Sequence, residues 1–456
     1  MLGFFGNLVI ALEHNPNMET ALEFAADHLG MVGGREVRKA MARGLLAGRA
    51  VGPAEILSGC GWDELARPAE LLEMAASEGC RERRSLILDR AMSSVLSHVR
   101  EKVVDFFERI KLPSLIVFGI GVLVPLVLVL LLPTLSFLGG PALPQMVLVY
   151  CLLLPAALLF MTERITEGRP EFIEPPDVGI ERPLLPVVLV LAAAAAAVLL
   201  LLHGELAVFL ALWLSVSAVS AALLTAGLRP LRTRIEIERI EEEFPDFLLE
   251  VGNRLSDGKP IEKAIADYGR DKGTPLGRVV RGAAAEAASG SGLQGLLGRI
   301  GGKSRTITGG VRLLLASAER GGWEAGKTVV RISEHMRRIL ELKREMRRTF
   351  ADLLSTMRSL AVFFAPVLTA FTARMYEVIQ GGAVLLRSSP STSPVVALAA
   401  YSVILAALLV DYGVRLERGR DMPVRCVSVA VAMPVALGVF TVSWIVSRIL
   451  FGILVG

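Results

Sequence analysis

The chain has 456 residues, of which 53% are apolar, and 49 basic residues nearly balance 45 acidic ones. The apolar share exceeds the roughly 45–50% of soluble domains, which indicates membrane-spanning segments. The balanced charge excludes the global basic field of a nucleic-acid-binding protein, and the 6% aromatic content leaves few residues for base stacking.

Residues 1–111 are charged and have helical patterning. The N-terminal sequence MLGFFGNLVIALEHN lacks the basic region and cleavage site of a signal peptide, so we expect a buried amphipathic helix there. From about Arg81 to Lys111, apolar residues recur every three or four positions and form one stripe. Because such a stripe needs partner helices, this region is predicted to be a helical bundle.

Seven apolar segments follow in two groups. The first, Leu112–Phe137, has 26 residues without a charge, enough to cross a hydrocarbon core of about 30 Å. The others are 145–162, 184–202, 206–228, 359–379, 395–410 and about 426–445. Pro125 and Pro133 lie inside the first segment, where we expect kinks, and Pro366 lies inside the fifth.

This alternation predicts an all-α membrane protein with two helical-bundle modules and about seven transmembrane helices. The predicted regions are 1–111 (module 1), 112–162 (hairpin), 163–183 (linker), 184–228 (hairpin), 229–358 (module 2) and 359–456 (C-terminal spans). Arginines follow the even-numbered spans, whereas the loops after the odd-numbered spans contain only Arg387. By the positive-inside rule, the N-terminus and both modules are predicted to be cytoplasmic, in a multi-pass protein of the cell membrane.

An internal repeat relates the two halves of the chain. The matching patterns are Leu12-x5-Met18-Glu19-x-Ala21-Leu22 with Leu255-x5-Ile261-Glu262-x-Ala264-Ile265, LLEMAASEG (71–79) with LLLASAERG (313–321), and Pro125 with Pro366. Their separations are 243, 242 and 241 residues. Three matches at nearly constant spacing indicate a duplicated unit, in which a helical module precedes membrane spans.

The second copy resembles the type II secretion system F-domain family, the inner-membrane platform proteins of type II secretion, type IV pili and archaella. The resemblance lies in FPDFLLEVGNRLSDGKPIEKAIADYG and in GGVRLLLASAERGGWEAGKTVVRISEHM, which leads into LAVFFAPVLTAF. The fused length and the spans between the copies are most similar to the archaeal branch or to a fused tight-adherence pair. The likeness extends over nearly the whole chain and is stronger in module 2.

The resemblance implies a non-enzymatic platform without a cofactor. Its implied partners are a hexameric secretion ATPase bound from the cytoplasm, pilin- or archaellin-like subunits, the lipid bilayer and a second copy in a homodimer. Nucleic acid is not among them. The implied function is to couple the ATPase to the insertion of pilin-like subunits into a filament.

A competing interpretation concerns residues 321–328, GGWEAGKT, which fit the phosphate-binding P-loop expression. Lys327 would reach the β- and γ-phosphates and Thr328 would hold magnesium, making the protein a membrane ATPase or transporter. However, a P-loop follows a buried strand, and here the preceding VRLLLASAER has helical patterning. We therefore expect a glycine turn between two helices.

A basic run near the fifth span is the predicted partner-binding site. It consists of Arg337, Arg338, Lys343, Arg344, Arg347 and Arg348, interleaved with glutamates. One interpretation is a solvated helix face with pairs at i,i+4 spacing. The other is a docking surface for an acidic patch on the ATPase or for anionic headgroups. The sequence leaves both open.

Catalytic and metal chemistry have no strong signal in the sequence. The cysteines Cys60 and Cys80 are too far apart for a CxxC motif, and Cys151 and Cys426 lie in apolar runs. The five histidines are scattered without an HxxxH pair. We therefore predict no catalytic residue, no metal site and no cofactor.

Overall fold

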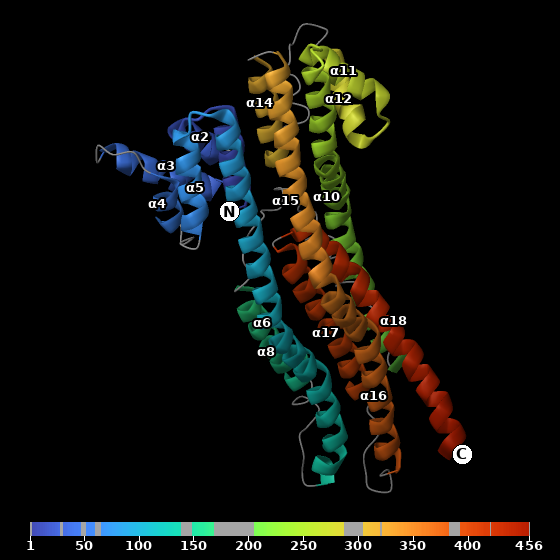
Figure 1. Cartoon of the computed structure of the whole chain (residues 1–456). Helices are drawn as coiled ribbons and strands as arrows, with labels where there is room; N and C mark the ends of the chain where they lie inside the picture. The colour runs from blue at the N-terminus through green and yellow to red at the C-terminus, as the bar shows by residue number, and fades with distance from the viewer. Residues whose placement is uncertain are drawn as a thin grey trace. The chain divides into compact units, whose positions relative to one another are not determined.

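The computed structural model describes residues 2–27, 31–46, 52–59, 65–137, 148–167, 205–286, 304–319, 322–382, 393–419 and 421–455. The regular elements in these ranges are all helices, as Figure 1 shows, which confirms the all-α prediction. The chain forms two compact units. Unit 1 consists mainly of residues 1–103 and 233–346, and unit 2 of 104–169, 177–232 and 347–456. Each unit therefore combines both halves of the sequence.

The first half of the chain begins with five short helices and one long one. They are α1 (Leu2–His14), α2 (Met18–Asp27), α3 (Met31–Leu46), α4 (Pro53–Gly59), α5 (Ala66–Ser77) and α6 (Arg81–Phe137). The predicted N-terminal helix is confirmed as α1, in which Phe4, Phe5 and Leu8 are fully buried. The side chain of Asn17 caps α2 by accepting hydrogen bonds from the amides of Glu19 and Thr20.

The second half repeats this order. Its helices that lie wholly or partly in unit 1 are α10 (Glu205–Ser256), α11 (Ile261–Asp271), α12 (Pro275–Glu286), α14 (Arg305–Glu319) and α15 (Gly322–Ser359). α11 begins 243 residues after α2, α12 begins 244 after α3, and α15 begins 241 after α6. The helices thus recur at the spacing of the sequence repeat.

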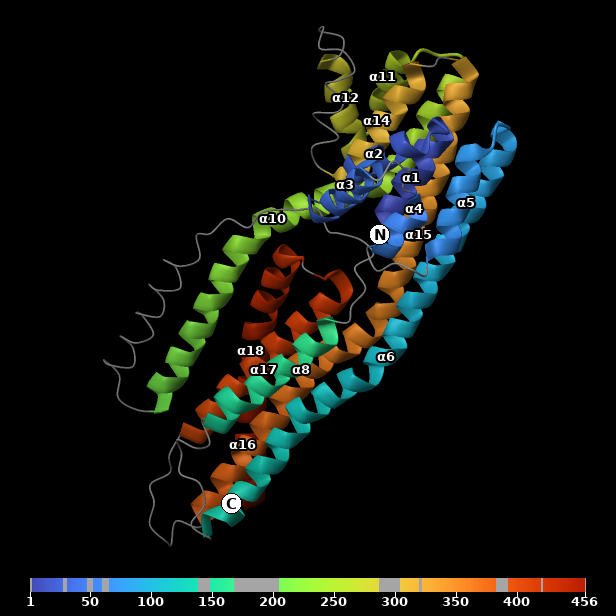
Figure 2. The same cartoon turned by 90° about the vertical axis from the view of Figure 1, so that its left-hand side faces the viewer.

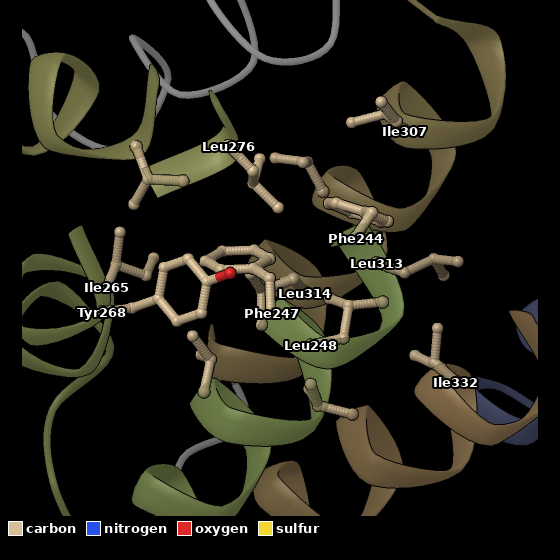
Figure 3. Close-up of a cluster of buried hydrophobic side chains, with 14 of the residues drawn as sticks. Phe244, Phe247, Leu248, Ile265, Tyr268, Leu276, Ile307, Leu313, Leu314 and Ile332 are labelled. Carbon is tan, nitrogen blue, oxygen red and sulfur yellow. The ribbon is translucent and has the colours of Figure 1, made fainter. Parts of the chain in front are cut away.

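The core of the second copy is built around the C-terminal part of α10 (Figure 3). Phe247 packs edge to face on Tyr268 of α11, with ring centroids 4.9 Å apart, and also contacts Phe244. Burial, with a smaller contribution from Glu243, raises the pKa of Tyr268 to about 12. Ile10 of α1 belongs to the same buried cluster, so the first copy contributes directly to the core of the second.

Unit 2 contains the apolar helices. Besides parts of α6, α10 and α15, it includes η2 (Val149–Leu153), α8 (Leu154–Glu167), η5 (Leu360–Phe364), α16 (Ala365–Gly382), α17 (Ser393–Arg418) and α18 (Met422–Val455). Five helices within the described ranges are long and apolar enough to cross a membrane: Val149–Glu167, Val208–Ser256, Leu354–Val378, Val395–Arg418 and Met422–Phe451. They correspond to the second, fourth, fifth, sixth and seventh predicted spans.

Two of the seven predicted spans are not among these five. Residues 112–137 form the C-terminal part of α6, and residues 184–202 lie outside the described residues. The predicted region boundaries at 111, 228 and 358 fall inside continuous helical segments rather than in loops. Charged and apolar stretches of the sequence are therefore joined in the same helices.

The proline in α6 is accommodated by two buried tyrosines. Pro125 has no amide hydrogen to offer the carbonyl of Gly121, four residues earlier. The hydroxyl of Tyr401 in α17 donates to the carbonyl oxygen of Gly121, and the hydroxyl of Tyr150 donates to that of Pro125 at 2.9 Å. Because an unpaired carbonyl is costly in an apolar setting, these bonds stabilise the proline-containing segment.

Two other prolines follow π-helical turns. η2 ends two residues before Pro155, and η5 ends two residues before Pro366. In η5 the amide of Ala365 donates to the carbonyl of Leu360, five residues earlier, and η2 has the same pattern. The wider π turn re-routes the helical hydrogen bonds next to the residue that lacks an amide hydrogen.

The tyrosine–carbonyl bond predicts a specific energetic coupling. Tyr401→Phe should destabilise the protein by about 1 kcal/mol, because the Gly121 carbonyl loses its donor. In a Pro125→Ala background the new amide can supply that bond, so Tyr401→Phe should then cost clearly less. Thermal unfolding of the four proteins in detergent measures the coupling.

Tyr412→Phe is the matched control, because Tyr412 bonds the hydroxyl of Ser114 at 2.7 Å rather than a freed carbonyl. Its cost should be the same with and without Pro125. Equal costs of Tyr401→Phe in both backgrounds would contradict this explanation of the bond.

Candidate functional site

Helix α15 contains the residues to which the sequence analysis assigned a possible function. One of its faces packs on α10 and another meets α6, while a third is exposed. Figure 2 shows α15 beside α6 in unit 1, where side-chain hydrogen bonds join the two helices. The candidate site is therefore the set of contacts that α15 makes with these two helices.

The proposed P-loop residues lie in helical turns. α15 begins at Gly322, so Gly326, Lys327 and Thr328 belong to its second turn, not to a turn between helices as expected from the sequence. The amides of these three residues lie in the helical ladder and are not arranged to cradle phosphates. The ammonium of Lys327 lies over the ring of Trp323, 3.7 Å from its centroid. The hydroxyl of Thr328 accepts a hydrogen bond from Arg81 at 2.6 Å.

Packing explains the glycine of the GKT sequence. A Cβ atom at Gly326 would lie 2.3 Å from the Oγ of Ser256 and 2.5 Å from the carbonyl oxygen of Gly252, both in α10. A Cβ at Gly252 would in turn lie 3.1 Å from the carbonyl oxygen of Gly326. Only glycines allow the two backbones to approach this closely.

The basic run is largely paired with acidic residues of the same chain. Three members bind carboxylates of α10: Arg337 binds Asp246 at 2.5 Å, Lys343 binds Glu241 at 3.6 Å, and Arg344 binds Glu242 at 3.7 Å. Arg338 binds Asp89 of α6 at 3.4 Å. These acids lower the positive potential that an acidic partner would meet.

The two remaining members of the run, Arg347 and Arg348, belong to unit 2. Arg347, like the four paired members of the run, interacts with another group of the protein. Arg348 is exposed and has no ion pair within the described residues. Four of the six predicted residues therefore bind carboxylates of α10 or α6, and Arg348 faces solvent.

The acidic segment of α10 was not singled out from the sequence. It reads IEIERIEEEFPDFLLE, and its carboxylates bind the basic run and also other groups. Glu243 accepts a hydrogen bond from the amide of Leu276 at 3.1 Å, and Glu241 accepts one from the hydroxyl of Ser304 at 2.5 Å. The many glutamates of this α10 segment and the basic run of α15 have opposite charge. This complementarity in the sequence could have predicted that the two helices pair.

Equivalent helices of the two copies face each other in unit 1. Arg81 of α6 donates to Glu324 of α15 at 2.8 Å, and Arg100 donates to Glu345 at 2.6 Å. The paired residues are 243 and 245 positions apart, close to the repeat spacing. A nearly constant separation along both helices means that α6 and α15 run parallel and in register. Equivalent positions of the two copies are therefore neighbours along this helix pair.

The same register occurs in unit 2. Phe350 of α15 contacts Phe106 and Phe107 of α6, with ring centroids 6.3 and 5.6 Å away. The second of these pairs is again separated by 243 positions. Aromatic contacts thus replace ion pairs where the helices become apolar.

A buried acid fastens α1 to the second copy. Glu13 is 4% exposed and accepts a hydrogen bond from Arg331 of α15 at 2.5 Å. Breaking a buried ion pair by removing one partner leaves an uncompensated charge and is costly. Together with Ile10 in the second core, this pair ties the N-terminal helix to α15.

His335 lies buried on α15 near the other copy. It is 3% exposed, and its Nδ1 has no hydrogen-bond partner among the described atoms. Burial is the main cause that lowers its pKa to about 4; Asp89 opposes this shift, and Arg338 and Arg331 add to it. The imidazole is therefore neutral at physiological pH.

Charge pairs also occur in unit 2. Asp411 accepts two hydrogen bonds from Arg425, at 2.7 and 3.0 Å, and forms an ion pair with Arg415 at 2.7 Å. This cluster ties α17 to α18 next to their short connection. Arg374 donates to Glu377 at 2.6 Å in α16.

Other candidates for chemistry are dispersed. Cys80, Cys151 and Cys426 are free thiols, and Cys60 lies outside the described residues. The described part of the chain contains no group of three or more metal-ligating side chains placed to hold an ion. The chain matches no protein-family model, no curated protein and no solved structure.

From the close contact at Gly326 we expect that a larger side chain at this position destabilises the folded protein. Gly326→Val should lower the free energy of unfolding by about 1–3 kcal/mol, because α10 and α15 must separate. Thermal unfolding in detergent measures the change. Gly119→Val is the control, since Gly119 is also helical but no neighbouring group lies within 4 Å of the place its Cβ would take. Equal losses in both variants would contradict the close-packing explanation.

The environment of His335 predicts acid sensitivity. Below pH ~6.5 the unfolded chain binds a proton at this residue, whereas the folded chain does so only near pH 4. Stability conferred by the neutral imidazole is therefore complete above pH ~6.5 and is lost as the pH falls towards 4, by up to about 1.4 kcal/mol per unit. Unfolding of wild type and His335→Gln across this range measures the slope.

The His335→Gln variant should have a flatter pH dependence. Ser333→Ala is the control, because Ser333 is a buried polar residue of the same helix that donates to the carbonyl of Pro245 at 2.7 Å. It should shift stability equally at every pH. An unchanged slope in His335→Gln would show that other groups cause the acid sensitivity.

Proposed function

We propose that the chain is a membrane-embedded, non-enzymatic platform protein of a type IV pilus-like, archaellum-like or type II secretion-like machine. It docks a cytoplasmic hexameric secretion ATPase and couples it to the insertion of pilin-like subunits into a filament. The multi-pass character follows from the five apolar helices. The rest of the proposal is supported by the sequence resemblance and by the arrangement of the two copies.

The parallel pairing of α6 and α15 is the observation that carries the proposal. Each helix starts in a charged module, and each continues into an apolar segment. Two ion pairs and an aromatic contact at the repeat spacing join them. A partner that displaces one module therefore acts on two long helices together, which suits mechanical coupling.

The contacts of the GKT residues do not favour the alternative of a P-loop ATPase. Lys327 is stacked on Trp323, and Thr328 is bonded to Arg81 and to the carbonyl of Glu324. Phosphate binding would require these groups to leave their present partners and the helix to unwind. The platform function needs no such change.

The two functions predict opposite results with purified protein in lipid nanodiscs. The platform should bind the hexameric secretion ATPase and should not hydrolyse ATP by itself. Lys327→Ala should leave both properties unchanged, because Lys327 would not contact nucleotide. ATP turnover by the protein alone and co-elution with the ATPase measure them.

A catalytic-site variant of the ATPase is the control for contaminating turnover. Hydrolysis by the nanodisc sample alone that disappears in Lys327→Ala would favour the P-loop enzyme. Absence of any complex with the ATPase would contradict the platform function.

A further inference from the structure

Helices α3 and α12 occupy equivalent places in the two copies and can be compared residue by residue. Each packs on the preceding helix of its copy, α2 or α11. At a separation of 243 the identical pairs are Gly34/Gly277, Arg35/Arg278, Val37/Val280, Arg38/Arg281, Ala40/Ala283 and Ala42/Ala285. Identity at equivalent places in two otherwise divergent copies indicates residues that the fold itself requires.

Structural roles are visible for two of these pairs. Val37 and Val280 are buried. The guanidinium of Arg281 donates to the carbonyl of Gly269 at 2.7 Å and thereby caps α11, while Arg38 pairs with Asp27 at the end of α2 at 3.4 Å. The second arginine of each copy thus fastens its helix to the preceding one.

The copies differ on the exposed face of this helix. Lys39 and Arg43 of α3 correspond to Gly282 and Glu286 of α12 at the same separation of 243. The exposed side chains described on α3 are Arg35, Arg38, Lys39, Ala42, Arg43 and Leu46. Leu46, at the end of this face, is 90% exposed. The fold does not need the two additional basic residues, because the second copy forms the same helix without them.

The face of α3 differs from the basic run of α15 in its surroundings. In α15, Arg337, Lys343 and Arg344 each have a carboxylate of α10 as partner. On α3, the guanidinium of Arg43 donates to a backbone carbonyl, which carries no formal charge. Arg38 remains 61% exposed in its ion pair with Asp27. The backbone partner of Arg43 therefore leaves its positive charge uncompensated, whereas Arg38 shares its charge with a carboxylate, as the three residues of α15 do.

We propose that this exposed face of α3, from Arg35 to Leu46, is a docking surface for an acidic patch on a cytoplasmic protein partner. Clustered guanidinium and ammonium groups attract carboxylates and steer association, and the terminal leucine adds apolar contact. The site belongs to the first copy alone, because Gly282 and Glu286 remove it from the second. The proposal rests on the platform function, in which the partner is the secretion ATPase.

The test gives α3 the charge pattern of α12. Lys39→Gln with Arg43→Glu should weaken binding of the purified hexameric ATPase to the nanodisc-embedded protein at least about tenfold at low salt, and less at high salt. Arg83→Gln with Arg90→Glu changes the charge by the same amount on the exposed face of α6 and should leave binding unchanged. Surface plasmon resonance measures affinity, and thermal unfolding verifies that both double variants fold.

Each of the other outcomes contradicts the proposed docking surface on α3, and each indicates a different alternative. If wild type binds the ATPase and the α3 variant binds equally well, only this proposal fails. If Arg344→Glu with Arg348→Glu abolishes binding while the α3 variant does not, docking belongs to α15. If the α3 variant loses binding to phosphatidylglycerol vesicles but not to the ATPase, the face binds lipid. If wild type does not bind the ATPase, the platform function and the docking surface fail together.

Discussion

Parallel packing of α6 against α15 is the constraint on which the arrangement of the two copies depends. The paired residues are separated by nearly the repeat spacing, from Arg81–Glu324 through Arg100–Glu345 to Phe107–Phe350. Two duplicated helices can stay in register over this length only if the side chains that face each other attract at each successive contact. Ion pairs meet this requirement where the helices are charged, and aromatic rings meet it where they are apolar.

Close packing and charge pairing together determine which residues of α15 are available to a partner. Gly326 brings α15 against α10, and the acids of α10 then lie beside Lys343 and Arg344. Exposed ion pairs of this kind contribute about 0–1 kcal/mol each, so they add little stability. Their larger effect is to lower the positive field of the basic run.

Sequence periodicity predicted the fold class and much of the element order. The apolar runs predicted about seven spans, and five of them lie in described helices that are long and apolar enough to cross a membrane. The repeat predicted the recurrence of α2 as α11 and of α6 as α15. These features depend on local composition and spacing, which a single sequence contains. The predicted region boundaries at 111, 228 and 358 follow the change from charged to apolar residues, and the structure is helical across all three positions.

The sequence by itself determined that the chain is helical, duplicated and rich in apolar spans, because periodicity and hydrophobic length act within each helix. Only the tertiary structure decided what the prominent motifs contact. Thr328 meets Arg81, Arg337 meets Asp246, and Tyr401 supplies the hydrogen bond that Pro125 cannot. Such contacts join residues up to hundreds of positions apart. They follow from how helices approach one another, which no local pattern specifies.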